Sequence, residues 1–188
     1  MKRFSYLTLA VCLLFGLNAC SQTSKPKPQK KAVAETTRAK GELTEGKPNN
    51  PYYSRTDTKK LKVSDAEWKK VLSPDLYEVS RHAETERAFT GKYWDADTKG
   101  TYYCAGCGNK LFESTAKFSS SCGWPSFFKQ DNKDSTVEKP DNSLGIERME
   151  VLCARCDGHL GHIFDDGPPP TGKRYCMNSI ALDFEPKK

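Results

Sequence analysis

Two Cys-x-x-Cys pairs carry the clearest chemical signal in the sequence. Cys104 and Cys107 form the first pair, and Cys153 and Cys156 form the second. Two-residue spacing lets both thiolates of a tight turn face one ion, and two such turns complete a tetrahedron of sulfur ligands. The pattern predicts a closed, structural site for one zinc ion, because zinc prefers sulfur ligands and undergoes no redox change.

Three other uses of these cysteines remain open at the level of sequence. An exported chain could hold them as disulfides. The second pair could also join His159 and His162 in a site of two sulfur and two nitrogen ligands, which would leave the first pair without a role. Iron–sulfur ligation is the third alternative. Residues 108–152 exceed the interval of a compact zinc ribbon, so we expect an inserted lobe between the two pairs.

Cys176 lies in a run, residues 174–180, that is typical of a β-strand. The strand period of two places Arg174, Cys176 and Asn178 on one face. A cation and an amide beside a thiol favour the thiolate, which is the nucleophilic form of cysteine. Cys176 is therefore a candidate nucleophile, and a buried structural cysteine is the alternative interpretation.

A glycine-rich stretch, residues 157–167, places His159 and His162 close to Asp165 and Asp166. Imidazole titrates near neutral pH and can donate a proton to a leaving oxygen. A single histidine here would more often be a core residue with satisfied hydrogen bonds. Two of the chain's three histidines occur together, however, and this favours a chemical role.

The remaining cysteine of interest, Cys122, begins the run Cys-Gly-Trp-Pro-Ser-Phe. Glycine and proline frame a rigid turn that presents the Cys122 thiol and the Trp124 indole. Trp124 could equally be a packing residue of the core. An aromatic wall would also suit a ligand that carries a methyl group on sulfur.

Two short helices and then a set of strands are expected to position these groups. Ser64 to Glu67 has the spacing of a capping box, and Ser73-Pro74 has that of an N-cap followed by proline. Beyond Phe89, short runs rich in Tyr, Phe, Val and Ile predict strands, of which the best are 102–103, 110–112, 146–152 and 174–184. The fold class is therefore a mostly β, antiparallel domain after two helices.

The motifs and their order resemble MsrB, the peptide-methionine (R)-S-oxide reductases. The resemblance covers about residues 64–185 and is highly specific. It rests on both cysteine pairs and on four runs, residues 86–91, 122–127, 158–164 and 174–179. It implies the MsrB fold of coiled antiparallel sheets, with a zinc ion opposite the active site.

The same resemblance implies roles for single residues. Cys176 matches the nucleophile, Cys122 the resolving cysteine and Trp124 the residue that holds the sulfoxide methyl group. The polar active-site set is matched by His159, His162, Asp166, Arg174 and Asn178.

The implied reaction is reduction of methionine-R-sulfoxide, free or in oxidised proteins. The Cys176 thiolate attacks the sulfoxide sulfur while His162 or His159 protonates the oxygen, and the resulting sulfenic acid condenses with Cys122. A thioredoxin-like reductant, exported if the enzyme is, then restores both thiols.

Two functions of other classes remain as alternatives. A zinc-knuckle module would bind protein or nucleic acid without catalysis. A general thiol oxidoreductase would need reactive thiols close in sequence, whereas both Cys-x-x-Cys pairs are better assigned to metal.

The amino terminus predicts export. Lys2 and Arg3 precede an apolar stretch, residues 4–17, that is too short to span a bilayer comfortably. The stretch ends at Leu-Asn-Ala-Cys20, which resembles the lipobox of bacterial lipoproteins. We expect residues 1–19 to be a signal peptide, with an ordinary secretory signal and a chance cysteine as the alternative.

Lipidation of Cys20 would attach several hydrocarbon tails, which is enough for stable anchoring. The expected location is the cell envelope. Because Ser21 follows the cysteine, resemblance to Gram-negative lipoproteins suggests the outer membrane, facing the periplasm.

Charge divides the mature chain into two parts. Residues 20–60 carry ten Lys and Arg against four Asp and Glu, whereas residues 61–188 carry 18 against 20. The first part also has few large apolar groups, so it is predicted to be a disordered basic tether. Residues 61–188 are the predicted catalytic domain. Because this domain is nearly neutral, no binding of nucleic acid is expected. We also expect a monomer.

Overall fold

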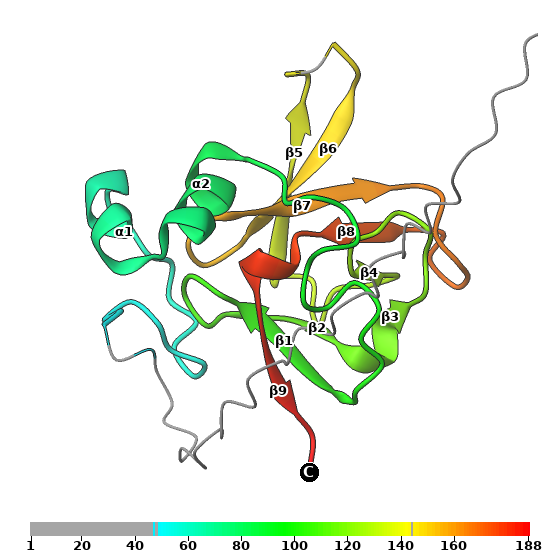
Figure 1. Cartoon of the computed structure of the whole chain (residues 1–188), viewed down its shortest axis with the longest axis horizontal. Coiled ribbons are helices and arrows are strands. Elements are labelled where there is room, and N and C mark those ends of the chain that lie inside the picture. The colour runs from blue at the N-terminus through cyan, green and yellow to red at the C-terminus, as the bar shows by residue number, and fades with distance from the viewer. Residues whose placement is uncertain (1–46, 48, 144) are drawn as a thin grey trace, which may run out of the picture. The chain divides into compact units, whose positions relative to one another are not determined.

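The computed structural model describes residue 47, residues 49–143 and residues 145–188 (Figure 1). The signal peptide expected at residues 1–19, the lipidation site expected at Cys20 and most of the expected tether lie outside these residues. Within the described part of the chain, no helix has the length and apolar character needed to cross a bilayer.

Both predicted helices are present. Helix α1 spans Asp65–Val71, and Ser64 caps it by accepting a hydrogen bond from a backbone N–H of the first turn. Helix α2 spans Pro74–His82, with Ser73 as its cap and proline in its first turn. It ends at Ala83, whose left-handed φ of 58° turns the chain toward the site.

The strands form two antiparallel sheets, which confirms the mostly β fold class (Figure 1). The three-stranded sheet has the order β2-β1-β9, with bounds Lys110–Glu113, Gly100–Cys104 and Leu182–Pro186. The six-stranded sheet has the order β3-β4-β8-β7-β6-β5. Its strands span Lys117–Phe118, Ser126–Phe127, Arg174–Met177, His159–Phe164, Arg148–Cys153 and Thr136–Asp141. A 3-10 turn, Ser114–Ala116, joins β2 to β3.

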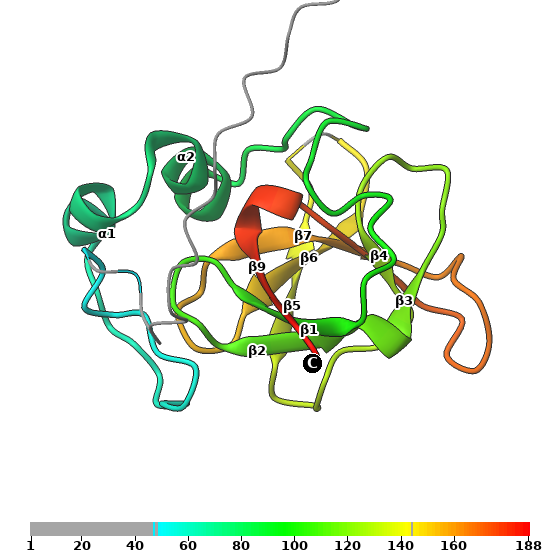
Figure 2. The same ribbon diagram turned by 60° about the horizontal axis from the view of Figure 1, so that its bottom comes forward.

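The hydrophobic core takes its side chains from both sheets, whose ribbons Figure 2 shows from a second direction. Phe112 of β2 stacks on Phe127 of β4 with ring centroids 4.3 Å apart, and Tyr102 of β1 meets Phe127 edge-on at 5.0 Å. Aromatic pairs of this kind contribute about 0.5–1.5 kcal/mol each beyond their buried area. The core therefore fixes β4, which is the neighbour of the cysteine strand β8 in the sheet.

The strand predicted over residues 174–184 is wrong in its middle. Strand β8 ends at Met177, a 3-10 turn follows at Ser179–Ala181, and the chain then enters β9 in the other sheet. The carboxylate of Glu86 accepts hydrogen bonds from the backbone N–H groups of Ser179 at 2.6 Å and Ile180 at 3.0 Å. These groups are therefore satisfied by a side chain rather than by a neighbouring strand, and the chain is free to change sheets.

Residues 47 and 49–61, called the amino-terminal segment below, lie against the first cysteine turn. Lys47 Nζ, Asn50 Nδ2 and Ser54 N donate to the successive carbonyl oxygens of residues 105–107, at 2.9, 2.8 and 2.9 Å. Tyr53 is buried. Domain packing therefore includes residues before 61, where composition predicts a tether, because this stretch carries apolar rings and donors for three turn carbonyls.

Substitution of Gly161 by alanine tests the close approach of β7 to β8. A Cβ atom at this position would lie 2.1 Å from Cys176 O and 2.9 Å from Met177 Cα, so the strands would have to separate. We expect the free energy of unfolding in urea to fall by about 1–3 kcal/mol. Gly172→Asn is the control, since an added Cβ there meets nothing within 4 Å and Asn tolerates its φ of 69°. Equal stability of both variants and the parent chain would contradict this account.

Candidate active site and metal centre

The four cysteines of the Cys-x-x-Cys pairs converge on one point. Their sulfur atoms all lie within 4.8 Å of one another, and all four residues are buried. Two of the sulfur–sulfur distances are 3.7 Å, from Cys104 to Cys156, and 3.6 Å, from Cys107 to Cys153. Metal–sulfur bonds of about 2.3 Å in a tetrahedron separate the sulfurs by about 3.8 Å. The cluster therefore has the dimensions of a four-thiolate metal site.

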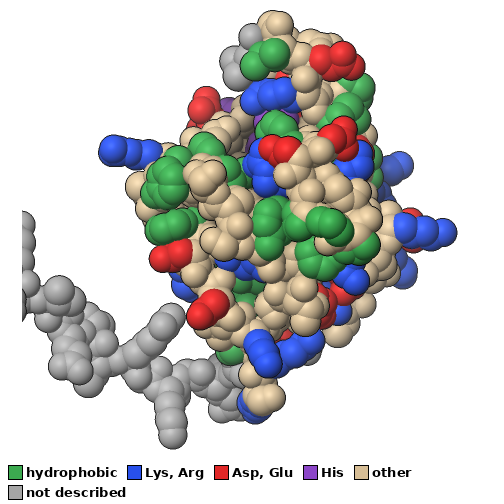
Figure 3. Space-filling model, turned by 90° about the vertical axis from the view of Figure 1, so that its right-hand side faces the viewer, with side chains coloured by type: hydrophobic (Ala, Val, Ile, Leu, Met, Phe, Trp, Pro, Cys, Tyr) green, Lys and Arg blue, Asp and Glu red, His purple; other side chains and the backbone are tan. Residues whose placement is uncertain are grey.

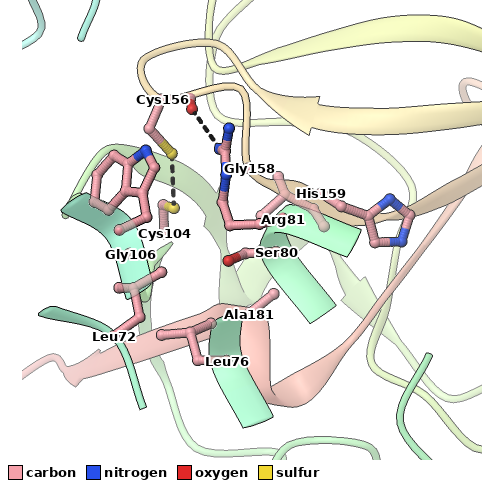
Figure 4. Close-up of a pocket in the computed structure, with 12 residues that line it drawn as sticks. Leu72, Leu76, Ser80, Arg81, Cys104, Gly106, Cys156, Gly158, His159 and Ala181 are labelled. Carbon is pink, nitrogen blue, oxygen red and sulfur yellow. Dashed lines mark hydrogen bonds between the residues drawn. The ribbon is translucent and has the colours of Figure 1, made fainter. Parts of the chain in front are cut away.

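The alternative uses of these cysteines fit the geometry less well. A disulfide needs sulfur atoms about 2.05 Å apart, and all six described cysteines are free. Figure 4 shows the imidazole of His159 directed away from the sulfurs of Cys104 and Cys156. Among the described residues, neither this histidine nor His162 joins the group that could hold an ion.

Two arginines hold the second cysteine turn in place. Arg81 of α2 donates to the carbonyl oxygen of Cys156 at 3.0 Å (Figure 4). Arg155 is only 3% exposed and donates to the carbonyl oxygens of Tyr52 and Cys107, and it pairs with Asp57 at 3.0 Å. The Arg155 guanidinium therefore ties both cysteine turns to the amino-terminal segment.

A second group of side chains surrounds Cys176. A cleft of about 120 Å³ opens here, and its walls include Trp124, Arg148, His162, Phe164, Cys176 and Asn178. The Cys122 sulfur lies 3.4 Å from the Cys176 sulfur, which is a non-bonded contact. Both candidate redox cysteines are thus within reach of each other, and Cys176 lines the cleft itself.

The surroundings shift the pKa values of the two thiols in opposite directions. Burial, followed by the adjacent Cys122 sulfur, raises the pKa of Cys176 to about 12, although the Arg174 guanidinium acts in the other direction. Burial also raises the pKa of Cys122, but hydrogen bonds from Ser120 and Ser126 outweigh it and lower that pKa to about 7. The surroundings therefore favour the thiolate of Cys122 over that of Cys176 in the reduced pair.

Strand register places His162 across from Cys176. The two residues are direct partners in the β7–β8 pair, so their side chains share one face of the sheet. The Nε2 atom of His162 lies 2.8 Å from Asp141 Oδ2, and the same oxygen accepts from Arg148 at 2.6 Å. Hydrogen bonds from Ser143 and then from His162 hold the pKa of Asp141 well below its usual range. A permanent carboxylate therefore orients the cleft imidazole.

His159 occupies a different position from the one that its motif implies. It is 3% exposed, it does not line the cleft, and its Nδ1 lies 2.7 Å from Glu150 Oε1. Burial lowers the pKa of His159, although Glu150 opposes this effect. Its ring is 5.4 Å from that of His162, centroid to centroid. His159 thus packs against the imidazole of His162 without lining the cleft. Of the two histidines, only His162 lines it.

Arg174 and Asp166 form a two-pronged ion pair. The Nε and Nη2 atoms of Arg174 donate to the two carboxylate oxygens of Asp166 at 2.8 and 2.7 Å. The guanidinium also lies over the Phe164 ring, 4.4 Å from its centroid. Asp166 is largely exposed and does not line the cleft. Its contact with the site is therefore indirect, through the orientation of Arg174.

One backbone segment holds both Trp124 and Asn178. The Trp124 indole Nε1 donates to Glu86 O at 3.1 Å, and Glu86 N donates to Asn178 Oδ1 at 3.0 Å. Asn178 Nδ2 in turn donates to Leu160 O at 3.1 Å. Asn178 lies just beyond β8, but these bonds keep its side chain at the cleft.

Sequence reasoning missed several residues that shape the site. Glu86 and Ser126 lie inside runs that carry the family resemblance, but the sequence did not indicate a role for either residue. Asp141 and Arg148 become partners only through the register of the β5–β6 hairpin, which projects beyond the rest of the sheet (Figure 1). Ser120 has no signal in the sequence beyond its closeness to Cys122.

The domain surface supplies no strong field of one sign on the face that Figure 3 draws, where basic, acidic and hydrophobic side chains are interspersed. The most exposed large ring is that of Phe89, at 54%. Its backbone N–H donates to Gly123 O at 2.8 Å, which places this ring beside the turn that bears Cys122.

The four-thiol cluster predicts one bound metal ion per chain. Cys104→Ser removes one ligand, and we expect loss of the stoichiometric ion together with loss of cooperative unfolding, because a structural ion contributes directly to folding free energy. Elemental analysis and thermal unfolding measure the two effects. Cys176→Ser is the matched control and should retain the ion; a metal-free parent domain that unfolds cooperatively would refute the assignment.

Comparisons with known proteins identify the family of this chain. Residues 72–186 match the model of the SelR domain family. The peptide methionine sulfoxide reductase MsrB of Thiobacillus denitrificans is 54% identical over 124 residues, covering 66% of this chain and 94% of the relative. The MsrB of Bradyrhizobium diazoefficiens is 56% identical over 132 residues, covering 70% and 94%. The MsrB of Acinetobacter baylyi is 49% identical over 126 residues, covering 67% and 91%. The chain therefore belongs to the MsrB family of peptide methionine sulfoxide reductases, as its motifs predict.

Proposed function

We propose that this chain reduces methionine-R-sulfoxide, free or within oxidised proteins, to methionine, with Cys176 as the nucleophile. One observation carries the proposal. Cys176 lines a cleft with its sulfur 3.4 Å from Cys122 and with His162 as its direct cross-strand partner. The proposed nucleophile and proton donor thus line one opening, and a second thiol contacts the nucleophile from the side.

The first step forms methionine and a sulfenic acid. The Cys176 sulfur attacks the sulfoxide sulfur; the oxygen then moves to Cys176 as its bond to the substrate sulfur breaks, and the transient bond between the two sulfurs breaks to release methionine. The thiol proton that Cys176 loses is balanced by the proton that the oxygen gains. His162 supplies that proton at the cleft and is returned to its starting state by the thiol proton. Asp141 Oδ2 lies 2.8 Å from His162 Nε2 and holds the imidazole in position.

The other cleft residues bind and orient the substrate. The Trp124 indole is held by its hydrogen bond to Glu86 O, so its ring forms a fixed wall for the methyl group on sulfur. Asn178 is held at both ends of its amide and offers its remaining N–H to the sulfoxide oxygen. Arg174 stabilises negative charge on the attacking sulfur, and Asp166 keeps it in position.

The second step forms a disulfide between Cys176 and Cys122, with release of water. The separation of 3.4 Å between the sulfurs supports direct disulfide formation without a large movement of β8 or of the loop that carries Cys122. An external dithiol then reduces the disulfide. We propose a thioredoxin-like protein for this role, located in the same compartment as the enzyme.

We further propose that the metal is zinc and that its role is structural. Four buried thiols offer a closed set of sulfur ligands, which suits zinc and leaves no open position for substrate. Cys104, Cys107, Cys153 and Cys156 would hold the ion, and no step of the reaction passes through it.

The amino-terminal motif supports an exported, lipid-anchored form of the enzyme. We propose cleavage after residue 19, acylation of Cys20 and residence in the cell envelope, at the outer membrane facing the periplasm in a Gram-negative cell. The domain acts as a monomer in this proposal. Oxidised envelope proteins are then its substrates.

An assay with both sulfoxide isomers tests the activity. We expect the purified domain, with dithiothreitol, to convert the R isomer of a blocked methionine sulfoxide and to leave the S isomer. Cys176→Ser should lower the rate by at least about a thousandfold, because Cys176 is the only described cysteine that lines the cleft. Chromatography of the methionine product measures both.

Cys122→Ser is the matched control for that assay. It should release one equivalent of methionine per chain in the absence of reductant, because the nucleophile is intact. Conversion of neither isomer would refute the enzyme and favour a binding module, whereas equal conversion of both would refute the R preference. Reduction of disulfides but not of sulfoxides would favour a general thiol oxidoreductase.

Mass spectrometry of the mature protein tests the anchor. We expect the chain to begin at Cys20 and to carry the added mass of a diacylglyceryl group and an N-acyl group. A Cys20→Ala chain should keep its full activity in solution but remain unprocessed. A mature protein that begins elsewhere, without lipid, would contradict the proposal.

A further inference from the structure

The resolving cysteine lies inside a cluster of hydroxyl groups. Ser120 Oγ lies 2.9 Å from Cys122 Sγ and 2.8 Å from Ser126 Oγ. Ser126 Oγ lies 3.4 Å from the same sulfur. Ser126 is 1% exposed at the start of β4, directly opposite Cys176 in the β4–β8 pair, and Ser120 belongs to the loop between β3 and β4. None of the reaction steps above uses these hydroxyls.

We propose that Ser120 and Ser126 are positioning residues for the resolving step: their hydroxyl groups hold Cys122 as a hydrogen-bonded thiolate that faces the Cys176 sulfur. This inference rests on the proposed function, because it concerns the step that follows formation of the sulfenic acid.

The hydrogen-bond pattern allows two states of the cluster. With Cys122 protonated, its S–H can donate to Trp124 O at 3.5 Å. With Cys122 ionised, Ser120 and Ser126 both have the sulfur within donor distance. Ser126 also has Trp124 O at 3.3 Å, so a rotation of its hydroxyl accompanies the change. Hydrogen bonds to a charged acceptor are roughly twice as strong as neutral ones, so the cluster favours the anion.

The charged surroundings of Cys122 act in the same direction. The residues of β8 that face Cys122 are Cys176 and Arg174. Interaction with both sulfurs helps to raise the pKa of Arg174. The chain before β1 contributes Ala88 and Phe89 to this turn, both apolar, at Gly123. The pKa of Cys122, about 7, then leaves a large thiolate fraction at neutral pH.

A thiolate is the form that the resolving step needs. The Cys122 anion attacks the Cys176 sulfenic sulfur, a sulfur–sulfur bond forms and the sulfur–oxygen bond breaks. The oxygen leaves as hydroxide and takes a proton from His162 to become water. Cys122 is oxidised and the Cys176 sulfur is reduced, so no outside oxidant is needed.

Single-turnover kinetics test the role of Ser120. The reduced domain is mixed with excess R-sulfoxide without reductant and quenched with acid over time, and methionine, sulfenic acid and disulfide are each measured. In Ser120→Ala we expect disulfide formation to slow about fivefold relative to methionine release at pH 7, because a pKa raised by about one unit lowers the thiolate fraction. The difference should vanish by pH 9, where the thiolate forms in either case.

Two further variants keep the test decisive. Ser121→Ala is the matched control, since Ser121 is exposed in the same loop and belongs to none of these contacts. Ser120→Thr retains a hydroxyl group and should restore the parent pH profile. Unchanged kinetics in Ser120→Ala, or a slowing of equal size at pH 7 and pH 9, would overturn the inference. Absence of methionine release from the parent domain would instead refute the proposed function.

Discussion

The register of β8 between β4 and β7 is the constraint on which the site depends. It sets Cys176 opposite Ser126 on one side and opposite His162 on the other. A shift of one residue would turn every side chain of β8 to the other face of the sheet. At Gly161 the two strands approach so closely that a side chain there would push β7 away from the Cys176 carbonyl. The positions of the proposed nucleophile, the proposed acid and the hydroxyl group of Ser126 thus follow from the pairing of one strand with its two neighbours.

The metal cluster and the cleft are opposite ends of the same strands. Strand β6 carries Arg148 at the cleft and Cys153 at the sulfur cluster, a separation of about 16 Å along an extended chain. Strand β7 begins with His159 near the metal end and reaches His162 at the cleft. A bound ion would therefore fix the end of β6 and the start of β7, whose opposite ends lie at the cleft. This arrangement separates the four thiols that could hold a metal from the two thiols proposed to undergo oxidation.

Local signals in the sequence were sufficient for the helices and for the cysteine pairs. The caps at Ser64 and Ser73 depend on neighbours three residues away, and each Cys-x-x-Cys pair is its own turn. Contacts between segments far apart in the sequence could not be predicted from such local signals. The long strand predicted near the carboxyl terminus is interrupted where Ser179 N–H donates a hydrogen bond to the Glu86 carboxylate. The hydrophobic periodicity of the sequence does not indicate this contact. The choice between His159 and His162 likewise depends on burial, which their shared motif does not encode.

The amino-terminal segment has a mechanical consequence. It meets the domain through bonds from Lys47, Asn50 and Ser54 to the first cysteine turn, and through Arg155. Tension applied to the chain ahead of Lys47 would thus be borne by the metal end of the molecule, in shear across several bonds at once. The strands at the cleft would carry almost none of that load. A domain pulled from its leading end would keep its pocket undistorted.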